Sequence, residues 1–353
     1  MAHIVDVQTQ FPKHRYSQSD LTQALLAYLN NSEVNPKLVS RLHESVQVKN
    51  RHLAMPVEAY LSLHNFTERN RAYGEIALSL GELCVSNLLN KCNIDAKSIS
   101  QLMFTTVTGL AVPSIDAQLM NRIPFSTHLK RVPIFGLGCI AGAAGISRAA
   151  DYLKGHPRDG VILLAIELCS LTIQKEDISM ANFVGSGLFG DGAAAVLMVG
   201  DEHPLAQNAK TQVVATQSDF YPNTEHVMGW KIGTSGFKLI LSAEVPHVAE
   251  HILPGSVINF LGKHELSISD IDHWISHPGG PKVITAIEKG LGLSSDALAL
   301  SRESLGDIGN LSSASVLAIF EKTLIKRKPQ KNARGLLLAM GPGFCSEMVL
   351  LSW

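Results

Sequence analysis

The chain has 353 residues, of which 46% are hydrophobic and 17% are charged, a balance typical of a globular protein with a large buried core. This composition excludes a disordered chain and a coiled coil, and a formal net charge of −1 offers no field that would attract nucleic acid. The five cysteines show no paired spacing, which argues against a disulfide framework and against a zinc ribbon.

The start of the chain carries no sign of a targeting segment. Residues 1–16 lack a basic stretch followed by an apolar one, and the apolar runs near Val161 and Ala193 reach about half of a membrane span. We therefore expect a cytoplasmic protein without stable membrane insertion.

Helical and strand patterns alternate along the first half. The periodicity predicts a helix over residues 75–91 and a strand over 102–108. A strand over 130–135 and a helix that ends at Leu153 follow, and then a strand over 161–166. This alternation predicts a layered α/β protein.

The second half repeats this order. A helix, a Ser-Ile-Ser segment and a strand follow one another in both halves. The Ser-Ile-Ser segment covers residues 98–100 in the first half and 267–269 in the second, where the strand covers 271–276. Cys139 opens a helix rich in small residues, and Asn310 opens a predicted helix over 311–324 that leads to a strand over 335–339. Cys139 and Asn310 therefore look like equivalent positions of a duplicated unit. We expect two units, residues 1–205 with the cysteine and residues 206–353 with a histidine and the asparagine.

Cys139 is a candidate nucleophile. It lies between a predicted strand and a predicted helix, so the helix dipole and the free N–H groups would favour thiolate over thiol. The small residues from Ala141 to Gly145 would allow close approach of backbone or substrate. A cysteine in this setting can equally be a small buried hydrophobe, and the local sequence does not decide between the two.

His277 and Asn310 supply partners for the thiol. His277 follows the strand over 271–276, and ligand chemistry gathers at such strand ends in α/β folds. Cysteine, histidine and asparagine together suit acyl transfer, in which the thiolate attacks a thioester and the other two side chains stabilise an oxyanion. Taken alone, His277 could be a structural histidine and Asn310 a helix cap.

These residues lie in motifs that resemble the type III polyketide synthases, the chalcone synthase superfamily on the thiolase fold. The resemblance covers nearly the whole chain. The matching motifs are Gly138-Cys139-Ile140-Ala141-Gly142, Leu188-Phe189-Gly190-Asp191-Gly192-Ala193-Ala194-Ala195, His277-Pro278-Gly279-Gly280, Gly309-Asn310-Leu311-Ser312-Ser313-Ala314 and Gly341-Pro342-Gly343. It implies a layered αβαβα fold with internal duplication.

The resemblance also implies a reaction. Cys139 would carry the acyl chain, while His277 and Asn310 would assist decarboxylation of malonyl-CoA and hold the enolate. Each cycle would be a decarboxylative Claisen condensation onto an acyl-CoA starter, with no organic cofactor and no metal. Ketoacyl-acyl carrier protein synthases share this trio, but their histidine motif normally reads His-Gln-Ala-Asn rather than His-Pro-Gly-Gly.

Departures from the plant pattern bear on the substrate. Phe189 matches one of two phenylalanines that usually gate the cavity, whereas Leu239 occupies the place of the second. Cys169 stands where chalcone-forming members carry threonine, and Thr172 and Ser312 would also line the cavity. These features and the segment at residues 228–233 resemble those of bacterial synthases that form alkylpyrones and alkylresorcinols. The resemblance implies an aliphatic and even long-chain starter. An aromatic or malonyl starter, as in chalcone- or tetrahydroxynaphthalene-type enzymes, is the alternative.

The resemblance further implies a homodimer and a coenzyme A site. Val112 falls where a methionine of the partner subunit usually closes the cavity wall. Arg41 aligns with one of the family's coenzyme A-binding basic residues. The other two positions fall at Leu38 and Ser45, and Lys37, Lys49 and Arg51 lie near enough to substitute for them. A solvated helix face would explain these basic residues equally well.

Two other motifs point to rival functions. Residues 185–190 fit the G-x-G-x-x-G pattern, but a strand rather than a helix is predicted after them, which argues against dinucleotide binding. Residues 247–251 fit the H-x-x-E-H pattern of a metallopeptidase, but an ordinary amphipathic helix gives the same pattern and a third ligand is not evident.

Overall fold

The computed structural model describes residues 1–29 and 33–353. Within these residues, nine strands form one mixed sheet in the order β11-β12-β13-β8-β1-β7-β6-β4-β5. Its strands are β1 (Ala2–Gln10), β4 (Ile99–Thr105), β5 (Lys130–Ile134), β6 (Gly160–Leu168), β7 (Asp191–Gly200), β8 (Thr211–Phe220), β11 (His273–Ser276), β12 (Arg334–Gly341) and β13 (Cys345–Ser352). Two antiparallel pairs stand apart from it, β2 (His14–Ser17) with β3 (Asn50–Leu53) and the hairpin of β9 (Met228–Gly233) with β10 (Gly236–Leu241).

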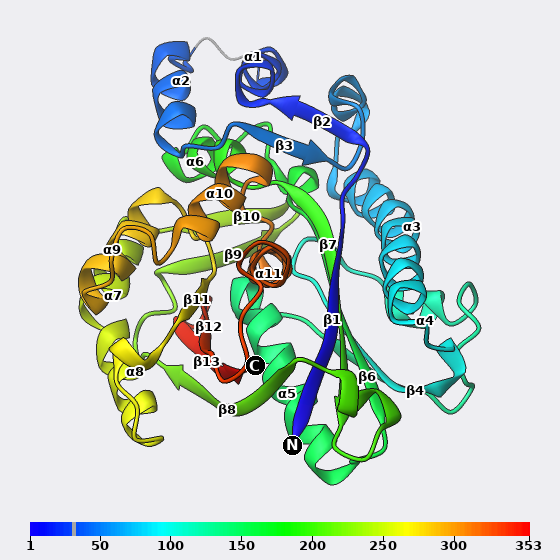
Figure 1. Ribbon diagram of the computed structural model, residues 1–353. Coiled ribbons are helices and arrows are strands. Elements are labelled where there is room, and N and C mark those ends of the chain that lie inside the picture. The colour runs from blue at the N-terminus through cyan, green and yellow to red at the C-terminus, as the bar shows by residue number, and fades with distance from the viewer. Residues whose placement is uncertain (30–32) are drawn as a thin grey trace.

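The helices lie in three layers (Figure 1). The central pair is α5 (Ala141–Gly155) and α11 (Ser313–Lys322), and α3 (Phe66–Cys92) covers the far side of the first half. The helices α7 (Val245–His251), α8 (Leu253–Gly262) and α9 (Pro281–Leu291) cover the far side of the second half. The remaining helices are α1 (Gln18–Leu29), α2 (Pro36–Ser45), α4 (Ile115–Leu119), α6 (Met180–Leu188) and α10 (Ala299–Ile308).

The strands show why these layers form. In β6, Leu163 faces the central helices while Leu164 faces α3, and in β12 Leu337 and Leu338 divide in the same way between the centre and α7–α9. A strand that is buried on both faces must be apolar throughout, and every residue of β6 is buried. The layered αβαβα arrangement expected from the sequence is therefore confirmed.

The internal duplication is visible in the strand pairing. In the first half, β4 runs parallel to β6, β6 antiparallel to β7 and β7 antiparallel to β1. In the second half, β11 runs parallel to β12, β12 antiparallel to β13 and β13 antiparallel to β8. The equivalent helices α5 and α11 pack closely because Gly142 lacks a side chain, since a Cβ there would lie 2.3 Å from the carbonyl oxygen of Ser313. This contact brings the starts of the two central helices together.

No helix among the described residues combines the length and the apolar character needed to cross a bilayer.

A buried histidine ties three helices together. His43 on α2 contacts the Thr22 hydroxyl of α1 through Nδ1 at 2.7 Å and the Ser186 hydroxyl of α6 through Nε2 at 3.2 Å. Burial lowers its pKa to about 4, and the positive charge of Arg51 adds to this effect. His43 is 1% exposed, so its protonation would place a charge in the core.

We expect His43 to make stability depend on pH. Between its ordinary pKa of 6.5 and about 4, the unfolded chain binds a proton that the native protein does not, so stability falls as the pH falls through this window. Relative to His43→Gln, the wild-type free energy of unfolding should drop by about 3 kcal/mol between pH 7 and pH 4. Urea unfolding at several pH values measures this difference, and the exposed His128→Gln serves as control. Equal pH dependence in wild type and His43→Gln would contradict the assignment.

Candidate active site

The thiol of Cys139 lies where β5 gives way to α5. A short 3₁₀ turn, Gly138–Ile140, follows the strand and precedes the helix, so the predicted strand-to-helix position is confirmed. Gly138 has a φ of +57°, and a Cβ there would lie 2.6 Å from the ring of Pro342, which explains the need for glycine. Cys139 itself is only 3% exposed.

Asn310 precedes the equivalent helix of the second half. The helix α11 begins at Ser313, two residues later than the sequence indicated, so Asn310 does not open it directly. Its Oδ1 accepts a hydrogen bond from the backbone N–H of Ser312 at 2.8 Å, and its Nδ2 lies 3.5 Å from Nε2 of His277. The asparagine is therefore held from one side and presents its amide N–H₂ to the histidine.

His277 follows the last residue of β11, at the carboxyl end of the strand. Its backbone N–H donates to the carbonyl oxygen of Leu338 at 2.8 Å, which continues the pairing with β12 and fixes the main chain. Ser312 completes the group, because its hydroxyl lies 3.6 Å from the sulfur of Cys139. The structure thus brings Cys139, Ser312, Asn310 and His277 together from both halves of the fold.

Burial controls the charges of this group. It raises the pKa of the Cys139 thiol to about 12 and lowers the pKa of the His277 imidazole to about 3. The prediction that the helix start favours the thiolate is therefore wrong, because desolvation outweighs the helix dipole.

The buried carboxyl group of Glu167 lies beside this site and was not predicted from the sequence. Glu167 near the end of β6 accepts hydrogen bonds from the Thr108 hydroxyl at 3.0 Å, from the backbone N–H of Val107 at 3.1 Å and from the Ser313 hydroxyl. Burial nevertheless raises its pKa to about 7. The signal was present in the sequence, because Glu167 is the one acidic residue in an otherwise apolar strand.

Four of the predicted cavity residues do share one cavity. Phe189, Leu239, Cys169 and Thr172 line a space of about 20 Å³. Trp230 also lines it, and this residue was not predicted although the hairpin pairs it directly with Leu239. Two residues separate β9 from β10, a spacing that is typical of a hairpin and could have revealed the pair.

The other predicted binding residues lie apart from this cavity. Val112 is fully exposed, and Lys37, Arg41 and Lys49 are exposed on α2 or just after it. Within the described part of the chain, none of these three basic side chains forms an ion pair. Arg51 is different, because it is 2% exposed and donates to the backbone oxygens of Ser186 and Phe189, so it cannot act as a surface anchor.

The two rival motifs form ordinary structure. Residues 185–190 span the end of α6, and the strand β7 follows as expected rather than a phosphate-binding helix. The rings of His247 and His251 contact each other at a tilt of 52° along α7, and Glu250 pairs with Lys289. In residues 1–29 and 33–353 no three potential ligands come close enough to hold a metal ion.

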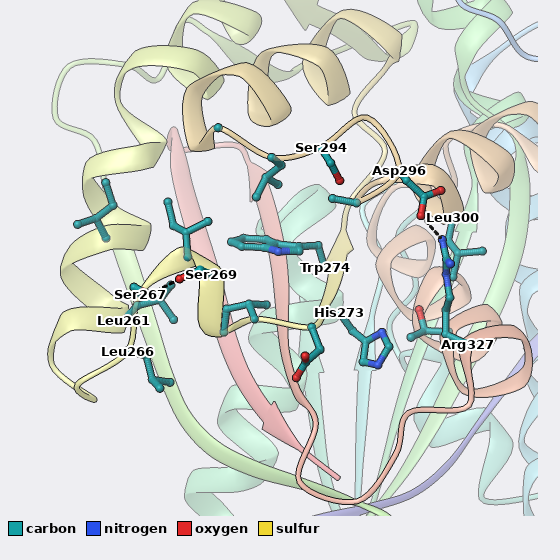
Figure 2. A pocket seen from close by; sticks show the side chains of 18 of the residues that line it. Leu261, Leu266, Ser267, Ser269, His273, Trp274, Ser294, Asp296, Leu300 and Arg327 are labelled. Atoms are coloured by element: carbon teal, nitrogen blue, oxygen red, sulfur yellow. Dashed lines mark hydrogen bonds and ion pairs between the residues drawn. The ribbon is translucent and has the colours of Figure 1, made fainter.

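A much larger cavity lies at the other end of β11. Figure 2 shows its lining, with Trp274 inside and Arg327 paired with Asp296 at 3.3 Å on its rim. Its volume is about 850 Å³, and His273 borders it at the amino end of the strand that carries His277 at its carboxyl end. None of the predicted site residues lines this cavity, so size alone does not identify the reactive centre.

Comparison with known proteins agrees with the geometry. The sequence matches the families described as "Chalcone and stilbene synthases, N-terminal domain" over residues 1–202 and "Chalcone and stilbene synthases, C-terminal domain" over residues 212–352. It is 46% identical over 350 residues to 1,3,6,8-tetrahydroxynaphthalene synthase of Streptomyces peucetius subsp. caesius, which covers 99% of this chain and 93% of the relative. It is 28% identical over 347 residues to phloroglucinol synthase of Pseudomonas fluorescens, with 97% of each chain covered.

A solved structure extends the likeness to three dimensions. The crystal structure of 1,3,6,8-tetrahydroxynaphthalene synthase from Streptomyces coelicolor A3(2), a bacterial type III polyketide synthase, matches with a TM-score of 0.93. The two chains are 29% identical, and the match covers 99% of each.

Proposed function

The chain belongs to the chalcone and stilbene synthase family and is a type III polyketide synthase, and from this premise we propose that malonyl-CoA serves it as both starter and extender. The observation that carries the proposal is that the bulky side chains of Phe189 and Trp230 line the same cavity as Leu239. An indole side chain opposite Leu239 leaves little room for a long acyl chain. The 46% identity to a tetrahydroxynaphthalene synthase points the same way.

We assign the chemical steps to the group around Cys139. His277 accepts the thiol proton, the sulfur attacks the starter thioester, and coenzyme A leaves as its thiol with that proton. A second malonyl-CoA then loses carbon dioxide, and the resulting enolate oxygen accepts hydrogen bonds from His277 and the Asn310 amide, which lie 3.5 Å apart. The enolate carbon attacks the acyl group on Cys139, and the sulfur departs as the new carbon–carbon bond forms.

Two further assignments belong to this proposal. The exposed Lys37, Arg41 and Lys49 would hold the phosphates of coenzyme A, whose negative charges require cations. A second copy of the chain would cover Val112, because an apolar side chain that is fully exposed in the single chain suits an interface.

An aliphatic starter is the second candidate. It is favoured by Leu239 in place of a gating phenylalanine and by Cys169 in place of threonine, since both give the cavity an apolar wall. The two candidates differ in which carbons of the product come from malonate.

Isotope labelling distinguishes them. We expect the protein, given uniformly ¹³C-labelled malonyl-CoA together with unlabelled hexanoyl-, decanoyl- and palmitoyl-CoA, to release a product in which every carbon is labelled. Mass spectrometry of the product measures this, and Cys139→Ala is the control for non-enzymatic condensation. A main product that keeps an unlabelled alkyl chain would contradict the malonyl starter and support the aliphatic one.

A further inference from the structure

A small cavity lies behind His277, on the side of this residue away from the reactive group. Ser276 and His277 line it, whereas Cys139, Ser312 and Asn310 do not. The rest of its wall is apolar and comes mainly from β9, β10, α7, α9 and β12. It shares no lining residue with the cavity already assigned to the substrate. Its volume is about 20 Å³, which is enough for one water molecule.

The contacts of Asn310 define which ring nitrogen of His277 carries the hydrogen. Oδ1 of Asn310 accepts from the backbone N–H of Ser312, so Nδ2, which can only donate, faces the imidazole. Nε2 of His277 lies 3.5 Å from this Nδ2 and must therefore be the accepting nitrogen. The hydrogen of the neutral ring is then on Nδ1. This form also suits the thiol of Cys139, because Nε2 must be unprotonated to take the thiol proton.

Nδ1 of His277 and the hydroxyl of Ser276 are both buried without a partner. Neither atom forms a hydrogen bond within the part of the chain that the structure describes, although His277 is only 5% exposed and Ser276 only 1%. The backbone oxygen of Ser276 does accept from the Ser301 hydroxyl at 2.7 Å, which fixes the end of β11. Among the described residues that line the cavity, only Ser276 carries a hydroxyl group. Because buried polar groups are nearly always paired, these two atoms require a partner inside the cavity.

We propose that one water molecule in this cavity joins Nδ1 of His277 to the hydroxyl of Ser276, and that Ser276 thereby acts as a positioning residue. The Nδ1–H group donates to the water, and the water donates to Oγ of Ser276. This link keeps the hydrogen on Nδ1 and leaves Nε2 free to accept the proton of Cys139. When the ring becomes an imidazolium, Nδ1–H retains its acceptor, so the buried charge is less costly. The inference rests on the proposed function, in which His277 is the base for Cys139.

Alkylation of Cys139 by iodoacetamide tests this proposal without any coenzyme A substrate. Peptide mass spectrometry measures the rate over a series of pH values. In Ser276→Ala we expect the rate at pH 7 to fall at least about tenfold and the midpoint of the pH–rate profile to rise by about one unit, because the imidazolium loses a hydrogen bond. A merely distorted site would lower the rate without moving the midpoint.

Ser304→Ala is the matched control and should behave like the wild type. Ser304 is also 1% exposed and its hydroxyl also lacks a partner among the described residues, but it does not line the cavity. A wild-type profile in Ser276→Ala, or an equal shift of the midpoint in Ser304→Ala, would overturn the proposal.

His277→Gln separates this proposal from the proposed function. We expect this variant to slow alkylation at least as much as Ser276→Ala does. Slow alkylation in His277→Gln together with a wild-type profile in Ser276→Ala would overturn the role of Ser276 and leave His277 as the base. A wild-type profile in His277→Gln would overturn the base itself, and the role of Ser276 with it.

A crystal structure of the wild-type protein keeps the test decisive if Ser276→Ala does not fold. We expect an ordered water molecule within hydrogen-bond distance of both Nδ1 of His277 and Oγ of Ser276. A cavity without this water, or a water that contacts only one of the two atoms, would overturn the proposal.

Discussion

Replacement of Cys139 by alanine is expected to reduce polyketide formation from malonyl-CoA by at least about 10³-fold, because the growing chain loses its covalent attachment. Intact-mass measurement should show an acyl adduct on the wild type and none on Cys139→Ala. Release of carbon dioxide from malonyl-CoA should persist in this variant, since His277 and Asn310 remain 3.5 Å apart and can still hold the enolate. The two readouts separate attachment of the chain from activation of the extender.

Matched variants define what each outcome means. Cys92 on α3 lies outside the site, so Cys92→Ala should keep full activity and the adduct. His277→Ala should lose both condensation and decarboxylation, because it removes one of the two groups assigned to the enolate. Wild-type activity in Cys139→Ala, or an adduct that maps to Cys169, would show that the nucleophile is assigned wrongly.

The sequence predicted the layers because the patterns it contains are local. A strand such as β6 is apolar on both faces and is followed by turn residues, so its existence and its burial can be read directly. The duplication could be read because Cys139 and Asn310 each precede a helix and a strand in the same order. The placement of His277 needed only the general rule that parallel strands end at one edge of a sheet.

The electrostatics of the site could not be read in the same way. A helix start predicts a thiolate, but burial of the sulfur raises the pKa of Cys139, and the hydrogen bond with Ser312 lowers it only in part; the sequence does not show that burial. Arg51 shows the same limit, because its neighbours in the chain are partly exposed while its own side chain turns beneath α6. The charge states of buried groups depend on contacts between distant segments. The formation of strands and helices depends mainly on residues that are close together in the chain.

Trp230 shows both what the local sequence predicts and what only the tertiary structure reveals. Its pairing with Leu239 follows from the hairpin alone, but only the structure shows that the hairpin lies against Phe189 and Cys169. Leu239 is smaller than the phenylalanine usual at its position and suggests a wider gate. The side chain of Trp230 on the facing strand fills part of the same space. Cavity size is therefore a property of the pair, and Leu239 alone is a poor guide to the starter.

Shortening Trp230 should accordingly change which starter the enzyme accepts. In Trp230→Ala, we expect the ratio of kcat/KM for hexanoyl-CoA to that for malonyl-CoA as starter to rise at least about tenfold, because each methylene admitted to an apolar pocket contributes 1–3 kcal/mol or so. Competition between the two starters, followed by mass spectrometry of the products, measures this ratio. Ile232→Ala is the matched control, since Ile232 lies on the same strand but is 53% exposed and does not line the cavity. Thermal unfolding of both variants checks that the site is intact. If the ratio stays constant in Trp230→Ala while the protein remains folded, the hairpin does not limit the starter, and the small-cavity basis for a malonyl starter is lost.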